Sequence, residues 1–313
     1  MSTPPPAADR TTGAGLAFAI SAYGIWGILP LFFILLQPTG AVEIVAWRIV
    51  LSLVFCALLI TVTRGWPRLI AVMRDRRTTL IMGAAGALIL VNWLTYVFAT
   101  LSDHVVEASL GYFTNPIVTV LLAVLVLREK LRPLQWASIG ISTIAVLVLA
   151  INYGSFPWIA LILAFSFGTY GLIKKQVGGR VDAISGLTLE TAWLAPAATI
   201  ALIVIGASGV MTFGTVSVTH TILLLSVGVV TAVPLLLFAA GARRLPLAYM
   251  GLTQYLAPII QFLIGVFVLQ EDMPFARWMG FAIVWVALIV LTVDMFLAGR
   301  AGRAGRRVVV QPA

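Results

Sequence analysis

Apolar stretches of about twenty residues, separated by short charged runs, dominate this chain. An α-helix of that length rises about 30 Å, which matches the hydrocarbon thickness of a bilayer. Hydrophobic residues make up 61% of the 313 positions and charged residues 10%, a balance that leaves too little polar surface for a water-soluble domain. The pattern therefore predicts an all-α integral membrane protein that crosses the bilayer many times.

The apolar runs between charged or turn-forming residues predict ten transmembrane helices. With the N-terminus in the cytoplasm, 18 of the 20 basic residues, all except Arg48 and Arg277, fall in the cytoplasm. This bias predicts that both termini are cytoplasmic, which requires an even number of spans. The predicted spans cover residues 14–36, 42–62, 78–100, 105–127, 132–151, 155–175, 185–206, 218–241, 247–269 and 274–297.

Several functional classes conflict with the sequence. The net charge of +9 follows from basic residues beside the membrane, so it predicts topology and no nucleic-acid partner. The single cysteine, Cys56, has no partner for a disulfide or a thiolate metal site. The Gly-Lys dipeptide of a phosphate-binding loop is absent, and the two histidines form no HExxH motif. We therefore predict no catalytic residues, no metal and no cofactor, and a protein that is not an enzyme.

The two halves of the chain match at a constant offset of 142 residues, with nine identities between positions 110–136 and 252–278. Each half holds five predicted spans, an odd number, so the second half is expected to be inverted relative to the first. Inverted repeats are typical of secondary transporters, in which two similar halves rock about a shared site. The identities outside the aliphatic residues are Pro116 with Pro258, Glu129 with Glu271, and Trp136 with Trp278.

The repeat predicts a division of the chain into two five-helix units. The first unit is expected to cover residues 14–151 and the second residues 155–297. A disordered cytoplasmic segment, residues 1–13, is expected to precede them, and a basic cytoplasmic tail, residues 298–313, to follow. The oligomeric state cannot be predicted from this pattern.

Prolines inside the spans point to a central cavity. A proline leaves the carbonyl four residues earlier without its helical hydrogen bond. Pro116 and Pro258, which are predicted hinges, free the carbonyls of Tyr112 and Gln254. The alternative is that these prolines only bend helices for packing. Three more prolines within spans, Pro30, Pro196 and Pro234, free the carbonyls of Trp26, Ala192 and Val230.

Polar and aromatic residues inside lipid need partners and are expected to face that cavity. Aromatic residues near span ends have an alternative place in the interfacial belt. The predicted substrate-binding residues are Trp26, Asn92, Trp93, Tyr96, Tyr112, Asn115, Tyr170, Gln254 and Tyr255.

Three ionisable residues inside spans are predicted to take part in coupling or to carry intramembrane charge: Glu190, Glu107 and Arg48. Arg48 and Glu107 alternatively form a structural ion pair. If protons are the coupling ion, Glu190 is the first candidate carrier and Glu107 the second. The repeat-related pair of Glu129 and Glu271 is expected to fix helix ends or a gate.

Several stretches closely resemble the RarD-type permeases, the chloramphenicol-sensitive proteins of the drug/metabolite transporter superfamily with paired EamA domains. The likeness runs from about residue 14 to 297, and it implies a ten-helix inverted repeat in a bacterial cytoplasmic membrane. Residues 127–130 read Leu-Arg-Glu-Lys where that family often has Leu-Gly-Glu-Arg, a change outside the expected cavity. The stretches are Asn92-Trp93, residues 107–116, residues 163–167, residues 170–172, residues 190–193, Val233-Pro234 and Gln254-Tyr255.

The sequence thus favours a gradient-driven transporter that exports a small metabolite or drug-like compound by alternating access. Its expected partners are a small-molecule substrate, the lipid bilayer and protons as a possible coupling ion. One alternative is an uptake permease for an amino acid or similar solute. The other, from a different class, is a non-transporting membrane partner or an embedded enzyme.

The topology can be tested by labelling single cysteines in a Cys56→Ser background. We expect a membrane-impermeant thiol reagent to modify Asp103→Cys in intact cells, because residue 103 lies in a predicted outer loop. Arg76→Cys should react only after the membrane is permeabilised. Modification of Arg76→Cys in intact cells would reverse the predicted orientation.

Overall fold

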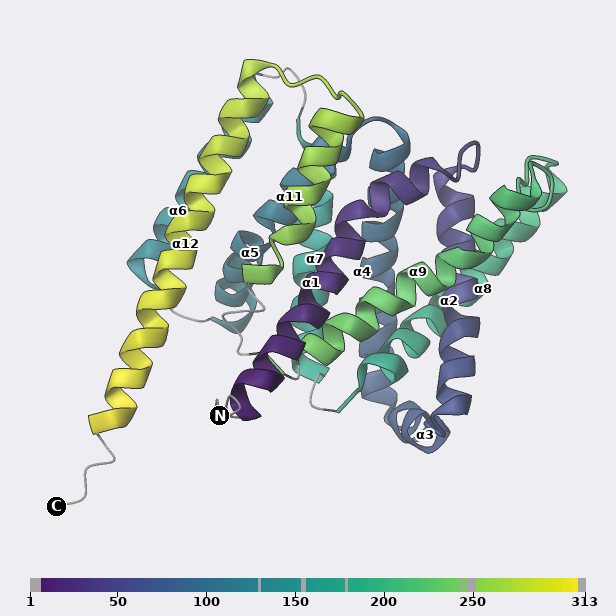
Figure 1. The fold of residues 1–313 in the computed structure, drawn as a ribbon, viewed down its shortest axis with the longest axis horizontal. Helices are drawn as coiled ribbons and strands as arrows, with labels where there is room; N and C mark the ends of the chain where they lie inside the picture. The colour runs from purple at the N-terminus through teal and green to yellow at the C-terminus, as the bar shows by residue number, and fades with distance from the viewer. Residues whose placement is uncertain are drawn as a thin grey trace, which may run out of the picture.

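The computed structural model describes residues 7–128, 131–152, 156–177, 180–242, 244–245 and 252–308, and every regular element within them is helical. Figure 1 shows these helices as a single bundle. The helices are α1 (Ala7–Ile34), α2 (Ala41–Val62), α3 (Trp66–Arg74), α4 (Arg76–Leu101), α5 (Val105–Leu127), α6 (Pro133–Asn152), α7 (Trp158–Val177), α8 (Ala183–Ala207), α9 (Val218–Ala242), α11 (Leu256–Leu263), the π-helix η1 (Ile264–Val268) and α12 (Phe275–Val308).

Seven helical segments are long and apolar enough to cross a bilayer. They lie in α1, α2, α4, α5, α8, α9 and α12, and each matches one of the predicted spans. Three shorter apolar helical segments, Pro133–Leu149, Trp158–Lys174 and Leu256–Val268, match the other three predicted spans. The protein is therefore a multi-pass membrane protein, and the number of ten spans stays a prediction.

The structure changes several predicted boundaries. Helix α1 begins at Ala7, inside the segment predicted to be disordered, and α12 continues to Val308, inside the predicted tail. The tail is rich in alanine and arginine, which favour helix. The charged segment after α2 contains a helix that the sequence did not predict, α3, whose Leu69 is buried while Ile70 and Met73 are exposed. Glu129 lies outside the described residues.

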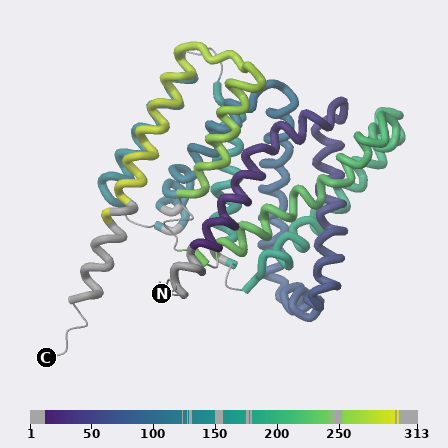
Figure 2. Tube along the Cα trace, in the orientation of Figure 1, coloured from purple at the N-terminus to yellow at the C-terminus, as the bar shows by residue number. Residues whose placement is uncertain are grey.

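Helix packing pairs elements of the two halves of the chain. Helix α5 packs on α7, and α11 packs on α1; α4 packs on α7, and α9 packs on α1. The contact between α2 and α9 likewise has an equivalent with the two halves exchanged, which is the contact between α8 and α4. Three more contacts join helices at equivalent positions in the two halves: α2 with α8, α5 with α11, and α6 with α12. Figure 2 shows α6 and α12 side by side at one flank of the molecule.

Two hydrophobic cores hold this arrangement. The larger core lies among α1, α2, α4, α5, α7, α8 and α9, and Phe33, Ile49 and Leu224 are among its buried residues. The smaller core lies among α5, α6, α11 and α12, where Phe262 and Phe281 pack with their ring centroids 4.7 Å apart. Because most other apolar side chains face outward, the helices turn an apolar surface toward lipid.

The repeat-related prolines have different local structures. Helix α5 continues through Pro116, so the described structure has no interruption at this predicted hinge. Pro258 instead lies in the first turn of α11, after a turn at residues 254–255, where its missing N–H leaves no helical hydrogen bond unmade. Further along the same predicted span the chain forms η1, and π-helical turns are frequent at functional sites.

Close helix contacts depend on glycine. A Cβ atom added to Gly228 in α9 would lie 2.6 Å from the backbone carbonyl of Leu51 in α2. Backbone atoms cannot move aside as the end of a flexible side chain can. The contact between α2 and α9 therefore requires glycine at this position.

We expect Gly228→Ala to destabilise the protein by about 1–3 kcal/mol, because the added methyl group overpacks a helix contact. Gly140→Ala is the matched control, since no atom lies within 4 Å of the methyl group that it adds to α6. Thermal unfolding of the two purified variants in detergent measures the difference. Equal stability of both variants would contradict the close contact.

Candidate functional site

A group of aromatic and polar side chains from five helices meets where the first half of the chain contacts α11 of the second half. We call it the central cluster. Its residues lie on α1, α2, α4, α5 and α11. The α1–α2 loop (residues 35–40) and the α4–α5 loop (residues 102–104) lie at one end of the bundle. The cluster residues on α2, α4 and α5 lie about two helical turns from that end. The central cluster consists of Trp26, Phe33, Arg48, Trp93, Tyr96, Tyr112 and Gln261.

Arg48 is the charged residue of the central cluster, and its side chain is buried. The guanidinium carbon lies 4.0 Å from the ring centroid of Trp93 and 5.8 Å from that of Phe33. A cation over an aromatic face gains electrostatic attraction from the ring. The predicted alternative of an ion pair between Arg48 and Glu107 is not found among the described residues, because Arg48 packs on these rings instead.

The carbonyl freed by Pro30 finds a partner inside the central cluster. The side-chain amide of Gln261 donates a hydrogen bond of 3.1 Å to the backbone carbonyl of Trp26, four residues before that proline. The Trp26 ring packs edge-on against Tyr23, with centroids 5.3 Å apart. A proline-freed carbonyl on α1 is thus paired with a polar side chain on α11.

Asn92 joins three helices. Its Nδ2 donates to the carbonyl of Leu163 at 3.2 Å and to the hydroxyl of Ser166 at 3.1 Å, both on α7. Its Oδ1 accepts a 3.0 Å hydrogen bond from the Tyr112 hydroxyl on α5. The Tyr112 ring also packs on Tyr96, with centroids 5.6 Å apart. Asn92 is therefore a structural link that also fixes the orientation of Tyr112.

A second polar group lies closer to the other end of α7 and connects to the central cluster through aromatic rings. Phe167 lies 6.0 Å from the Tyr112 ring and 5.8 Å from the Tyr170 ring. The Tyr170 hydroxyl donates to the Glu190 carboxylate at 3.3 Å, and Lys174 forms an ion pair with the same carboxylate at 2.8 Å. Glu190, which had no evident partner in the sequence, is thus paired and 2% exposed.

Three carboxylates accept hydrogen bonds from backbone N–H groups at the loop end of the bundle near residues 35–40 and 102–104. Glu43 accepts from Thr212 and Phe213, in the connection between α8 and α9. Glu107 accepts from Ile159, in the first turn of α7. The Glu107 contact satisfies a backbone group that α7 leaves unpaired at its start, while the Glu43 contacts hold the connection between α8 and α9.

Glu271 is the third of these carboxylates. Its oxygens accept hydrogen bonds of 2.6 Å from Val105 and 3.0 Å from Val106, the first residues of α5. Burial raises the pKa of the Glu271 carboxyl above its usual value, although both N–H donors favour the charged form. The prediction that Glu271 fixes a helix end is in line with this geometry.

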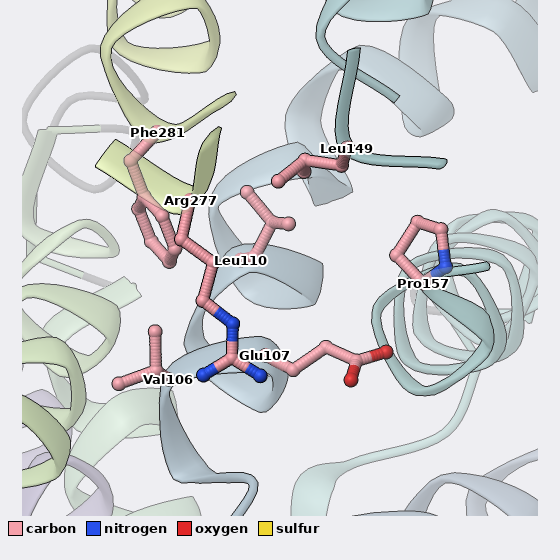
Figure 3. A pocket seen from close by; sticks show the side chains of 7 residues that line it. All are labelled: Val106, Glu107, Leu110, Leu149, Pro157, Arg277 and Phe281. Atoms are coloured by element: carbon pink, nitrogen blue, oxygen red, sulfur yellow. The ribbon is translucent and has the colours of Figure 1, made fainter. Parts of the chain in front are cut away.

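Figure 3 shows a pocket at the same end of the bundle, where the Glu107 side chain turns toward the segment of Pro157 that precedes α7. Arg277 and Phe281 of α12 complete its wall with apolar residues of α5 and α6. Its volume is about 20 Å³, room for about one water molecule. A pocket of this size does not hold a metabolite.

The structure places the remaining predicted residues apart from the central cluster. Gln254 lies in the turn before α11, about two helical turns from Gln261, with no hydrogen bond to the cluster. The Tyr255 ring packs against the smaller core beside α12. Asn115 lies beside Gly168 of α7, and its side-chain oxygen has no hydrogen-bond partner among the residues that the structure describes.

Two polar residues of the site, Gln261 and Lys174, were not among the sequence candidates. Gln261 follows Gln254 by two helical turns, so both amides lie on similar faces of one predicted span, and that spacing was a usable signal. Lys174 was assigned to the cytoplasmic end of its span by charge alone. Its side chain reaches back along α7 to Glu190, as long basic side chains near helix ends do.

Removing one partner of the Lys174–Glu190 pair should leave a buried charge uncompensated. We expect Lys174→Met to destabilise the protein by up to about 3–5 kcal/mol, and by less if solvent reaches the carboxylate, since the Lys174 side chain is 29% exposed. The double variant Lys174→Met/Glu190→Gln should recover much of that loss. Denaturant unfolding in detergent is the measurement, and a double variant less stable than Lys174→Met would contradict the pairing.

Comparison with known proteins places this geometry in a family. Residues 13–151 match the model of the EamA-like transporter family. A protein named RarD from Streptomyces exfoliatus is 46% identical over 95% of this chain and 94% of its own length. An uncharacterized transporter from Bacillus subtilis is 39% identical over 94% and 98% of the two chains. A chloramphenicol-sensitive protein RarD from Pseudomonas aeruginosa is 28% identical over 90% and 94%.

A solved crystal structure shares the fold of this chain, with a TM-score of 0.56 and 18% sequence identity. The match covers 89% of this chain and 97% of the other. The multi-pass helical architecture and the relatives lead to one assignment: this chain belongs to the RarD permeases within the EamA-like transporter family.

Proposed function

We propose that this protein is a gradient-driven transporter that exports a small metabolite or drug-like compound across a bacterial cytoplasmic membrane. In this proposal ten spans form two inverted five-helix repeats, both termini lie in the cytoplasm, and the repeats expose one central site alternately to the two sides. The observation that carries the proposal is the central cluster, where polar and aromatic side chains from four helices of the first half meet Gln261 of the second half.

The helix contacts support an inverted repeat. Each contact between α5 and α7, α4 and α7, or α2 and α9 has an equivalent in which the two halves exchange roles. Such exchange is what a pseudo-two-fold axis between the halves requires, and the 142-residue offset in the sequence agrees with it. Two similar halves around one site can open toward either side by moving against each other.

The composition of the central cluster supports a small amphipathic substrate. Rings of Trp26, Phe33, Trp93 and Tyr96 offer apolar and stacking surface, while Tyr112 offers a hydroxyl group. Ligand sites of this kind are mostly apolar, with a few polar groups that fix orientation. The P. aeruginosa relative is named for its sensitivity to chloramphenicol, which is in line with a role in handling drug-like compounds.

Protons are the proposed coupling ion, and Glu190 is the first candidate carrier. A proton on Glu190 would remove its ion pair with Lys174, which links α7 to α8, and would so change the contact between two helices. Glu107, the second candidate, accepts a hydrogen bond from the start of α7. Ionophore-sensitive transport that persisted unchanged in both Glu190→Gln and Glu107→Gln would exclude proton coupling through either residue.

The function is tested by comparing metabolites in deletion and overexpressing cells, then measuring flux of the best hit in proteoliposomes. Export predicts that the compound accumulates inside deletion cells, and uptake of an amino acid or similar solute predicts depletion. Gradient-dependent flux in proteoliposomes is expected for either direction. Its absence for every compound that changes with expression would favour a non-transporting membrane protein.

Substitutions in the central cluster should weaken substrate binding without loss of fold. We expect Tyr112→Phe and Gln261→Leu each to raise the apparent Kd of the transported compound roughly 2- to 10-fold, as for loss of one neutral hydrogen bond. Gln254→Leu and Tyr255→Phe should retain wild-type affinity, since neither residue contacts the cluster. If proteoliposome assays instead showed weaker binding only in Gln254→Leu and Tyr255→Phe, the substrate site would lie near Gln254, as the prolines alone predict.

A further inference from the structure

The guanidinium of Arg48 has unused hydrogen-bonding capacity. Its Nε and Nη1 atoms are buried and have no hydrogen-bond partner among the described residues. No ion pair of Arg48 is found in that part of the chain either. A buried charge without a counter-charge is costly, and intramembrane charges persist where function requires them.

The neighbouring acidic groups are committed elsewhere. Glu43, on the same helix as Arg48, accepts from the backbone at Thr212 and Phe213. Glu190 is paired with Lys174, at the other end of α7. In the described part of the chain, the Arg48 cation packs on the aromatic faces of Trp93 and Phe33 and forms no ion pair.

Other polar atoms beside Arg48 are also unpartnered. The Tyr96 hydroxyl and the amide oxygen of Gln261 are buried near each other, and neither makes a hydrogen bond of normal geometry in the described part of the chain. The Tyr96 ring packs on Phe33 and on Tyr112, and Phe33 also packs on the guanidinium, so both phenols belong to the same cluster as Arg48. The two unpartnered guanidinium nitrogens, which carry three N–H groups, and a phenol hydroxyl together form a set of hydrogen-bond donors.

We propose that Arg48 binds the anionic group of the transported compound, and that this compound is a small organic monoanion, a carboxylate attached to an apolar or aromatic body. The proposal rests on the proposed transport function and specifies its substrate class. A guanidinium presents its N–H groups in a fork that matches a carboxylate. The rings of Trp93, Phe33 and Tyr96 would then contact the apolar body.

The charge balance selects a monoanion. A single negative charge neutralises Arg48, whereas a dianion would leave one uncompensated negative charge inside the membrane. A zwitterion would bring an ammonium group, and no carboxylate lies free in the described part of the central cluster to receive it. The geometry therefore favours a monocarboxylate over a phosphate ester or an amino acid.

Equilibrium binding to the purified full-length protein in lipid nanodiscs tests this inference. The probes are phenylacetate, neutral phenylacetamide and cationic phenethylamine, which share one ring and differ in charge. Radiolabelled phenylacetate should bind saturably, and only unlabelled phenylacetate should displace it efficiently. Absence of saturable phenylacetate binding, or equal displacement by phenylacetamide, would overturn the proposal.

Arg48→Gln should weaken phenylacetate binding roughly 10- to 100-fold, as expected for loss of charge-assisted hydrogen bonds. Arg68→Gln, at an exposed position on α3, removes the same charge and should bind like wild type. Unchanged binding in Arg48→Gln would show that the cation does not hold the anion. Arg48→Lys keeps the charge without the fork and should bind several-fold more weakly than wild type, so wild-type affinity in that variant would also count against the proposal.

Thermal unfolding separates a binding role from a structural one. Arg48→Gln removes an uncompensated buried charge, so it should unfold at a temperature no lower than that of the wild type. Phenylacetate should raise the unfolding temperature of the wild type and not that of Arg48→Gln. A variant that unfolds at a much lower temperature would assign Arg48 to structure. The binding and unfolding assays need no ion gradient. A negative result in them would exclude the proposed anion site but would not affect the proteoliposome flux test of transport.

Discussion

The absence of water in the membrane interior is the constraint on which this structure depends. Every backbone N–H and C=O group must find a partner inside the protein, and helices provide partners everywhere except at their ends and at prolines. The structure resolves these exceptions with polar side chains. Glu43, Glu107 and Glu271 accept from backbone N–H groups at one end of the bundle, and Gln261 donates to the carbonyl that Pro30 frees. These four polar residues are thus placed where the backbone needs them.

Much of the fold follows from the sequence because length and hydropathy are strong signals. Each predicted span coincides with an apolar helix, and the α1–α9 and α4–α7 contacts agree with the internal offset. A local rule also held: Pro30 predicts that the Trp26 carbonyl lacks its helical hydrogen bond, and in the structure this carbonyl accepts from Gln261 instead. The sequence did not indicate which side chain would take it, because the donor lies 235 residues away.

Residue-level differences between expectation and structure share one physical cause, which is that hydropathy constrains neither the rotation nor the depth of a helix. Tyr255 was expected in the cavity, but its helix turns that ring toward α12. Pro116 stays a predicted hinge, although α5 passes through it without interruption. Lys174 was placed at a span end by its charge, although its flexible stem lets it reach a buried carboxylate. Such outcomes depend on tertiary packing, which a single sequence does not reveal.

The carboxylate contacts at one end of the bundle have an evolutionary consequence. Glu271 bonds to the main chain of Val105 and Val106, and the main chain is the same for every residue except proline. Substitution at either valine therefore leaves the donors in place, while substitution at Glu271 removes the only acceptor of both bonds. Residues 105 and 106 can therefore vary among homologous sequences without loss of these hydrogen bonds, whereas residue 271 cannot. The Lys174–Glu190 pair differs, because there either side can lose the interaction.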